Sequence, residues 1–321
     1  MSPSGASSLL KNVALASTAT LVALGLGEAA VRVAIMVWHR EPIVASDPGT
    51  GWRGRADLDD VDVAMSGGHF RVTTDGAGRR VLPPGPTEIG VSTVVLVGDS
   101  FSFGLAVNDR ETFPWFLAEQ HGDRRFLNLG VPGWGSDQEM VSLEQYFREA
   151  GTTVVSDVIV LVTENDFSDV QRSMDTYLGR RKPTFRMRGT ELDTGAFRLS
   201  VADHLMDVSR LTWLVRSKLA SIRRLARIDP AGGEEIVVAA LERIRLMTEA
   251  RGARLHLFAY RRSREKTGLT DAMWRSFLDR SHATDITASI FVGDGDPIAF
   301  DGGHWSAEGN RRAARVMGAG L

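Results

Sequence analysis

The 321-residue chain contains no cysteine and only four lysines, and no low-complexity or repeated segment interrupts it. The lack of cysteine excludes disulfides, a thiolate nucleophile, cysteine-ligated metals and a lipidated cysteine anchor, but it does not decide the compartment. Arginine supplies most of the positive charge, and at a net charge of −2 no basic excess predicts a nucleic-acid partner. With 43% apolar residues, the chain is long enough to bury one large core.

The longest apolar stretch is at the N-terminus. From Val13 to Trp38 about 26 residues follow one another with few charges, enough to span a bilayer core of ~30 Å. Glu28 and Arg32 are four residues apart, so on a helix they lie on one face and can pair. We expect residues 1–40 to form a membrane-anchor helix. A cleaved signal peptide and an amphipathic or buried helix are the alternatives.

Residues 41–90 are rich in Gly, Asp and Pro and predict an extended lead-in with one strand-like run, His69 to Thr73. From residue 91 onward, short apolar runs alternate with helical patterns. This alternation predicts βαβ units, with a mainly parallel sheet between two helical layers, an α/β/α sandwich. The expected strands are 93–97, 125–129, 157–162, 254–258 and 289–292, and the expected helices are 114–120, 136–149, 234–251, 270–280 and 307–318.

Residues 167–232 break the alternation. Residues 183–200 have the pattern of a hairpin, and apolar residues from Leu211 to Leu225 recur at helical spacing. We therefore expect an insertion at about 167–232 within a domain of residues 91–321. We expect it to lie over the active-site end of the sheet.

A serine stands where the first expected strand ends. The run Val94-Val95-Leu96-Val97 leads directly into Gly98-Asp99-Ser100, so Ser100 is expected at the carboxyl edge of the sheet, where open α/β folds bind ligands. Near the C-terminus, Asp301 and His304 are three residues apart on a loop that opens the last helix. This spacing allows the carboxylate to reach Nδ1 of the imidazole while Nε2 faces the Ser100 hydroxyl. The three groups together predict nucleophilic catalysis by serine.

Two further motifs lie between these ends. Asn128-Leu129-Gly130-Val131-Pro132-Gly133 follows the second expected strand, and Asn165-Asp166 follows the third. The order Gly-Asp-Ser, Asn-Leu-Gly-x-x-Gly, Asn-Asp, Asp-x-x-His resembles that of the SGNH (GDSL) hydrolase family, and the lead-in resembles that of its bacterial membrane-anchored members. The resemblance implies a flavodoxin-like α/β/α fold and an esterase.

The resemblance also implies roles for single residues. Ser100 would attack the acyl carbon, His304 would move its proton, and Asp301 would orient the imidazole. The Ser100 and Gly133 backbone N–H groups and the Asn165 side chain would form the oxyanion hole, with Gly130 as the alternative glycine. Thr163 stands where the family usually has glycine before the Asn motif. Asp99 and Asp166 we expect to hydrogen-bond the loop backbone, and Trp134 and Trp305 could line a pocket or belong to the core.

These features predict a membrane-anchored, extracytoplasmic serine hydrolase of an O-acyl ester, on a cell-surface glycan or glycolipid by family habit. An O-acyltransferase would use the same residues, because the two differ only in which acceptor is shielded from water. A non-catalytic carbohydrate-binding module on the same fold is the alternative from another class. The other histidines lack the spacing of metal ligands, and no cofactor or metal is expected.

Overall fold

The central feature of the computed structural model, which describes residues 3–38, 42–88, 90–175, 177–189, 191–223, 230–262 and 269–321, is a five-stranded sheet. Its order is β11-β10-β7-β5-β6, and each neighbouring pair is parallel. The strands are β5 (Thr93–Gly98), β6 (Arg125–Asn128), β7 (Val155–Thr163), β10 (Arg254–Tyr260) and β11 (Thr284–Asp285). Counted along the chain, this is the flavodoxin-like order 2-1-3-4-5.

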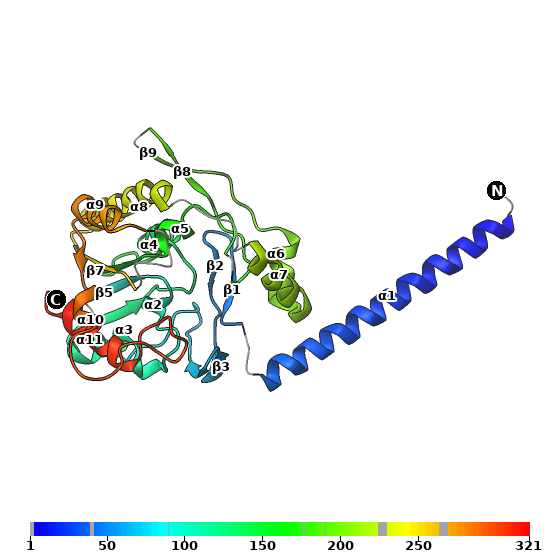
Figure 1. The fold of residues 1–321 in the computed structure, drawn as a ribbon, viewed down its shortest axis with the longest axis horizontal. Helices are drawn as coiled ribbons and strands as arrows, with labels where there is room; N and C mark the ends of the chain where they lie inside the picture. The colour runs from blue at the N-terminus through cyan, green and yellow to red at the C-terminus, as the bar shows by residue number, and fades with distance from the viewer. Residues whose placement is uncertain are drawn as a thin grey trace.

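Side chains of the central strands alternate between the two faces of the sheet. In β5, Val95 and Val97 belong to one apolar cluster, and Val94 and Leu96 belong to another, because successive strand residues point to opposite faces. The first cluster is covered by α4 (Ser136–Glu149), α8 (Pro230–Ala250) and α9 (Asp271–Ser281), and the second by α3 (Phe113–Gln120), α10 (Thr287–Ile290) and α11 (Ala307–Gly318). The predicted α/β/α sandwich is confirmed (Figure 1).

One expected strand, 289–292, is wrong. The chain there forms the short helix α10, in which the Ile290 N–H donates to the Ile286 carbonyl at 3.2 Å. The last strand is instead β11, a polar pair of residues that adds to the edge of the sheet beside β10. The three apolar residues Ile290, Phe291 and Val292 fit a strand or a helical turn equally well, so periodicity could not separate the two.

The lead-in is more regular than the extended segment that the sequence predicts. It forms two antiparallel hairpins, β1 (Val44–Asp47) with β2 (Gly51–Gly54) and β3 (Val61–Met65) with β4 (Gly68–Val72). Trp52 and Phe70 of these hairpins pack with Phe103 and Trp134 of the sheet domain in a third apolar cluster.

Five elements occupy the described residues from 166 to 223. They are α5 (Asp166–Asp169), the antiparallel pair β8 (Phe185–Arg188) and β9 (Glu191–Thr194), α6 (Val201–Val208) and α7 (Arg210–Arg223). The predicted hairpin and helix are both present, although Leu225 lies outside the described residues. The short helices α2 (Ser100–Phe103) and η1 (Asp109–Glu111) follow β5.

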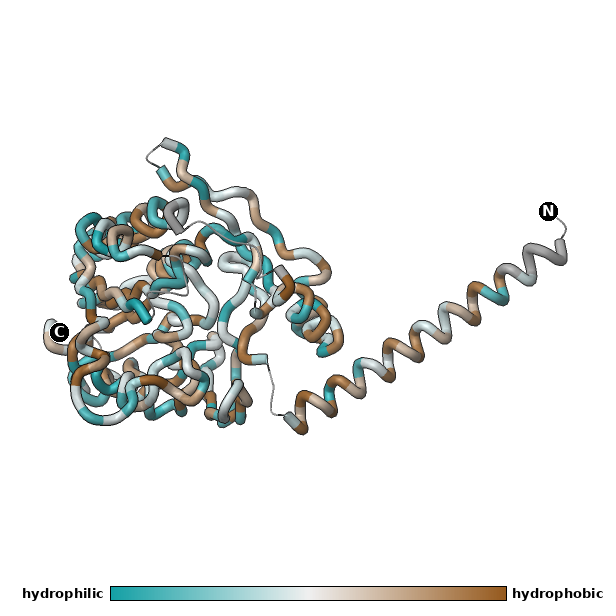
Figure 2. The backbone as a smooth tube through the Cα atoms, in the orientation of Figure 1, coloured by the Kyte–Doolittle hydropathy of each residue, from teal (hydrophilic) through white to brown (hydrophobic). Residues whose placement is uncertain are grey.

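The N-terminal helix α1 (Pro3–Val37) extends away from the rest of the molecule (Figure 1). Its segment Leu10–Val37 is long and apolar enough to cross a membrane, and only 6% of its most apolar window is buried. Figure 2 shows apolar residues along much of its length. The predicted pair is present, with Arg32 Nε 2.7 Å from Glu28 Oε1.

Candidate active site

Ser100 is the first residue of α2, at the carboxyl end of the central strand β5. Asp99 caps this helix, and its side chain accepts a hydrogen bond from the Phe101 N–H at 2.9 Å. A Cβ at Gly98 would collide with the Ser102 side chain, so only glycine allows the strand to turn this tightly into the helix. The Ser100 N–H lies in the first helical turn, where backbone donors have no acceptor within the helix.

A tight loop before α11 carries Asp301 and His304. Asp301 Oδ1 accepts hydrogen bonds from the backbone N–H groups of Gly303 at 2.9 Å and His304 at 3.0 Å. Gly302, between Asp301 and Gly303, has φ +67°, a conformation that glycine adopts at little cost. The base of the loop is closed by a bridge between Ile298 and Trp305. The loop backbone thus fixes the carboxylate against the histidine that follows it.

The structure brings Ser100, His304 and Asp301 together in a hydrogen-bonded chain. His304 Nε2 is 2.9 Å from Ser100 Oγ, and His304 Nδ1 is 2.5 Å from Asp301 Oδ2. Burial opposes ionisation of Asp301, but the bonds from His304 and the loop N–H groups outweigh it and lower the pKa of this carboxyl to about 2. An ionised Asp301 holds the tautomer with hydrogen on Nδ1, which leaves Nε2 free to accept the serine proton.

Asn165, the side-chain donor implied by the resemblance, lies beside the residue that precedes the serine. Its Nδ2 is 3.1 Å from Asp99 Oδ2 and 3.1 Å from Asp169 Oδ2. Both amide hydrogens therefore point to carboxylates in this structure. Donation to an oxyanion requires one of these bonds to be exchanged for the acyl oxygen, and that role stays a prediction.

The geometry separates the two candidate glycines. The Gly130 N–H is already donated to Asn128 Oδ1 at 2.9 Å, and a Cβ at Gly130 would lie 2.6 Å from that of Ser102. Gly130 therefore serves the close packing of its loop against α2. Gly133 has φ +80°, so a side chain there would be strained. Because the Gly130 N–H is already donated, Gly133 stays the predicted backbone donor of the oxyanion hole.

Thr163 has a role that its departure from the family pattern did not indicate. Its hydroxyl lies 2.8 Å from Asp99 Oδ2 and 2.6 Å from Asn165 Oδ1, so it links the loops after β5 and β7. Asp166 Oδ2 accepts from the Thr163 N–H at 3.1 Å and from Ser136 Oγ at 3.1 Å. The expectation that Asp99 and Asp166 bind loop backbone is confirmed.

A group of buried acids beneath these loops was not expected from the sequence. Burial raises the pKa of Asp99, and it raises the pKa values of Glu139 and Asp166 well above their usual range. Burial also raises the pKa of Asp169 to about 7. Glu139 is fully buried, and neither of its carboxyl oxygens has a hydrogen-bond partner in the described structure. In sequence this residue resembled an ordinary acidic residue of a helix first turn.

The two tryptophans belong to the core. Trp305 is 1% exposed and stacks edge-on against Phe101, with ring centroids 4.9 Å apart. Trp134 is buried, and its Nε1 donates to the Trp52 carbonyl at 2.9 Å. Core packing, one of the two possibilities that the sequence left open, therefore explains Trp305, whereas the buried Trp134 also lines a cavity of about 360 Å³.

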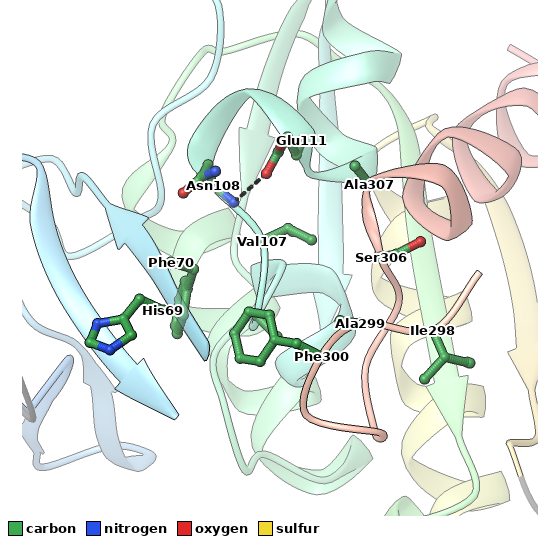
Figure 3. Close-up of a pocket in the computed structure, with 11 residues that line it drawn as sticks. His69, Phe70, Val107, Asn108, Glu111, Ile298, Ala299, Phe300, Ser306 and Ala307 are labelled. Atoms are coloured by element: carbon green, nitrogen blue, oxygen red, sulfur yellow. Dashed lines mark hydrogen bonds between the residues drawn. The ribbon is translucent and has the colours of Figure 1, made fainter. Parts of the chain in front are cut away.

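A cavity of about 300 Å³ lies behind the loop that carries His304. In Figure 3, Phe300 from this loop projects into the cavity opposite Phe70 and His69 of β4. A second, more polar cavity of about 360 Å³ has Gly130 and Val131 in its wall. Neither Ser100 nor His304 lines either cavity.

A metal site needs several ligating side chains close together. No group of three or more histidine, aspartate or glutamate side chains in this part of the chain is placed to hold a metal ion.

Comparison with known proteins found no matching family model and no matching curated protein. Several solved structures resemble the chain. One is a member of the lipolytic G-D-S-L family from Veillonella parvula, with 11% identity, coverage of 70% of this chain and 95% of that one, and a TM-score of 0.40. Another is a psychrotrophic esterase from Pseudoalteromonas, with 11% identity, coverage of 70% and 93%, and a TM-score of 0.39.

Proposed function

We propose that this protein is a serine esterase of the SGNH (GDSL) type that cleaves an O-acyl ester. The observation that carries the proposal is the pairing of Nε2 of His304 with Ser100 Oγ at 2.9 Å while Asp301 holds Nδ1. His304 takes the serine proton as Ser100 attacks the acyl carbon, and returns it to the leaving alcohol. Water then attacks the acyl carbon while His304 takes its proton, and His304 returns this proton to Ser100 Oγ as the acid leaves.

The oxyanion of the tetrahedral intermediate would be stabilised by the backbone N–H groups of Ser100 and Gly133 and by the Asn165 amide. One lost donor of this kind typically costs ~10² to 10³ in rate. The order of the four sequence motifs supports this assignment, as does the proximity of Asn165 to Asp99, the neighbour of Ser100.

The proposed substrate is an acyl ester of a cell-surface glycan or glycolipid, and α1 would anchor the enzyme with its catalytic domain outside the cytoplasm. The apolar segment Leu10–Val37 supports the anchor. The orientation rests on the family resemblance.

A fluorophosphonate probe tests the nucleophile. We expect it to label the wild-type chain and Ser221→Ala, an exposed serine of α7, but not Ser100→Ala. Equal labelling of Ser100→Ala would refute the assignment of the nucleophile. No labelling of a folded wild-type chain would favour the non-catalytic binding module.

The acyltransferase alternative uses the same residues and differs in the acceptor. Release of the alcohol from a model acetyl ester should proceed at the same rate with and without an added glycan. Acceleration by the glycan, with the acyl group recovered on it, would assign transferase activity instead.

A further inference from the structure

The helix α1 is attached to the rest of the molecule through the insertion. Glu28 Oε1 accepts from the Arg210 N–H at 3.0 Å, and Glu28 Oε2 accepts from the Leu211 N–H at 3.0 Å and from Ser209 Oγ at 2.9 Å. These donors form the start of α7, so Glu28 serves as its cap from another helix. Arg32 Nη2 also donates to the Val208 carbonyl at 2.6 Å, at the end of α6.

These hydrogen bonds determine the residue of α1 at which the helix leaves the rest of the molecule. Gly27 lies against Leu211, where an added Cβ would be 3.4 Å from Leu211 Cδ2. Toward the N-terminus the helix is exposed, for example at Leu21 (70%). From Leu10 to Gly27 the helix is about 27 Å long at 1.5 Å per residue, close to the thickness of a bilayer core. If residues 10–27 form the span, one surface of the bilayer core lies next to Gly27 and the start of α7.

The two helices at this level have exposed apolar rows. Among the described residues after Trp38, half of the exposed large apolar side chains belong to α6 and α7. They are Val201, Leu205 and Val208 of α6, and Val215, Leu219 and Ile222 of α7. In each helix the three residues have i, i+4, i+7 spacing and share one face. The opposite faces are buried at Met206 and Ala220. Figure 1 shows that α6 and α7 lie between the sheet domain and α1.

We propose that α6 and α7 form an interfacial foot that rests on the same bilayer that α1 spans, with these six side chains in the boundary between headgroups and acyl chains. Helices of this kind insert their apolar face about 5–10 Å into that boundary. Exposed apolar rows on two helices that contact each other are unusual on a soluble domain and mark an interaction site. The proposal rests on the anchoring proposed above, and it does not require esterase activity.

The position of the patch favours lipid over a second copy of the chain as its occupant. Glu28 and Arg32 tie the foot to the helix at the point where the span would begin. A membrane contact there adds a second point of attachment and stops the domain from swinging about α1. The catalytic Ser100 would then be held at a fixed height above the bilayer.

The absence of cysteine makes a direct test possible, because any introduced cysteine is the only one in the chain. Single-cysteine variants of the full chain, Leu219→Cys and Ile222→Cys, would carry an environment-sensitive fluorophore in vesicles of phosphatidylcholine and phosphatidylglycerol. Leu246→Cys is the matched control, since Leu246 is 49% exposed and apolar but lies on α8. Leu21→Cys in α1 is the reference for the bilayer interior.

We expect lipids with a shallow spin label to quench positions 219 and 222 by about twofold or more, lipids with a deep label to quench position 21, and neither to quench position 246. Quenching at 21 without quenching at 219 and 222 would overturn the foot, and disulfide cross-linking of Leu219→Cys between copies would assign the patch to a protein interface. No quenching at 21 would overturn the anchor and the foot together. Equal quenching at position 246 would contradict the proposal that lipid contacts α6 and α7 in particular.

A second variant tests the link between foot and anchor. Glu28→Ala in the Leu219→Cys background should reduce quenching at 219 by about half or more and leave quenching at 21 in the corresponding variant unchanged. Fluorophosphonate labelling of the same samples reports separately on the active site. If labelling fails while the quenching pattern holds, the esterase proposal falls and the foot stands. Unchanged quenching at 219 would show that Glu28 does not hold the foot.

Discussion

The carboxylate of Asp301 receives three hydrogen bonds, from Nδ1 of His304 and from two loop N–H groups. This arrangement keeps it ionised at any pH at which an esterase is assayed, because the bonds lower its pKa to about 2. Protonation of Asp301 therefore cannot account for a loss of activity within that pH range. The lowered pKa of Asp301 also stabilises the fold: this contribution is fully present above the ordinary aspartate value of 3.8 and is lost as the pH falls toward 2.

Replacing Asp301 with asparagine preserves the shape of the side chain and removes its charge. We expect kcat of Asp301→Asn to fall on the order of 10³ to 10⁴, because the histidine loses its tautomer control and the stabilisation of its charged form. Hydrolysis of a chromogenic acetyl ester over about pH 4 to 8 measures this. A variant that retains wild-type kcat would remove Asp301 from the proposed mechanism.

Glu139 is a buried acid whose two oxygens lack partners in the described residues. Burial raises its pKa well above the usual range, so the folded chain holds a proton that the unfolded chain releases above about pH 4.3. Between about pH 4.3 and the raised pKa of Glu139 in the folded chain, a rise in pH therefore lowers the free energy of unfolding. Glutamine has nearly the same shape without this dependence.

We therefore expect Glu139→Gln to be as stable as the wild type near pH 5 and more stable near pH 8, by an amount on the order of 1 kcal/mol or more. Urea unfolding at the two pH values measures the difference. Glu139→Ala, which leaves a cavity, should be destabilised at both. A loss of stability in Glu139→Gln at pH 8 would mean that the carboxylate is ionised and needed.

At the scale of elements, the site depends on how closely the Asn128 loop approaches α2. Asn128 Nδ2 donates to the Ser102 carbonyl at 2.8 Å, and Gly130 fits directly against the same helix. A methyl group at residue 130 would lie 2.7 Å from the Phe103 nitrogen, so one of the two segments would have to move. Because α2 begins with Ser100, such a movement would displace the nucleophile.

Gly130→Ala should therefore lower the free energy of unfolding by about 1–3 kcal/mol and reduce the rate of fluorophosphonate labelling. Gly122→Ala is the matched control, since no other atom lies within 4 Å of a Cβ at that position. Unfolding by urea and labelling kinetics would be measured on both variants. A Gly130→Ala protein with wild-type stability would contradict the close packing seen here.

At the scale of the whole molecule, the lead-in supports the loop that carries Gly133. Trp52 is fully buried, and its Nε1 donates to the Pro132 carbonyl at 3.0 Å. Its own carbonyl accepts from Trp134 Nε1 at 2.9 Å. Trp52 is therefore hydrogen-bonded to both sequence neighbours of Gly133, Pro132 and Trp134. Trp52 belongs to the lead-in, outside the sheet domain.

We predict that Trp52→Phe lowers kcat by about tenfold, because the released Pro132 carbonyl lets the Gly133 loop shift. The free energy of unfolding should fall by about 1–3 kcal/mol, because a hydrogen bond and part of the buried volume are lost. Trp115→Phe is the control, since the Trp115 Nε1–H donates to the exposed Glu119 of its own helix, at 2.8 Å, and not to the Gly133 loop. If kcat is unchanged while the protein unfolds more easily, the lead-in only adds stability.

The sequence predicted the features that depend on local pattern. β-branched runs placed β5 and β7, and the helical pattern placed α4 and α11 at their observed bounds, because each element buries one face with its own period. The alternation of strands and helices then determined the layered fold. The order of the Ser, Gly, Asn and His motifs pointed to the residues that the parallel strands bring to one edge.

Only the tertiary structure decided features that depend on atoms distant in the chain. Gly130 packs against Ser102 of α2, the Thr163 hydroxyl lies 2.8 Å from Asp99 Oδ2, and Glu139 is fully buried. The attachment of α7 to Glu28 across 182 positions is of the same kind. A hydrogen bond or a desolvated charge is set by the relative placement of packed segments, and no local period in the sequence records that placement.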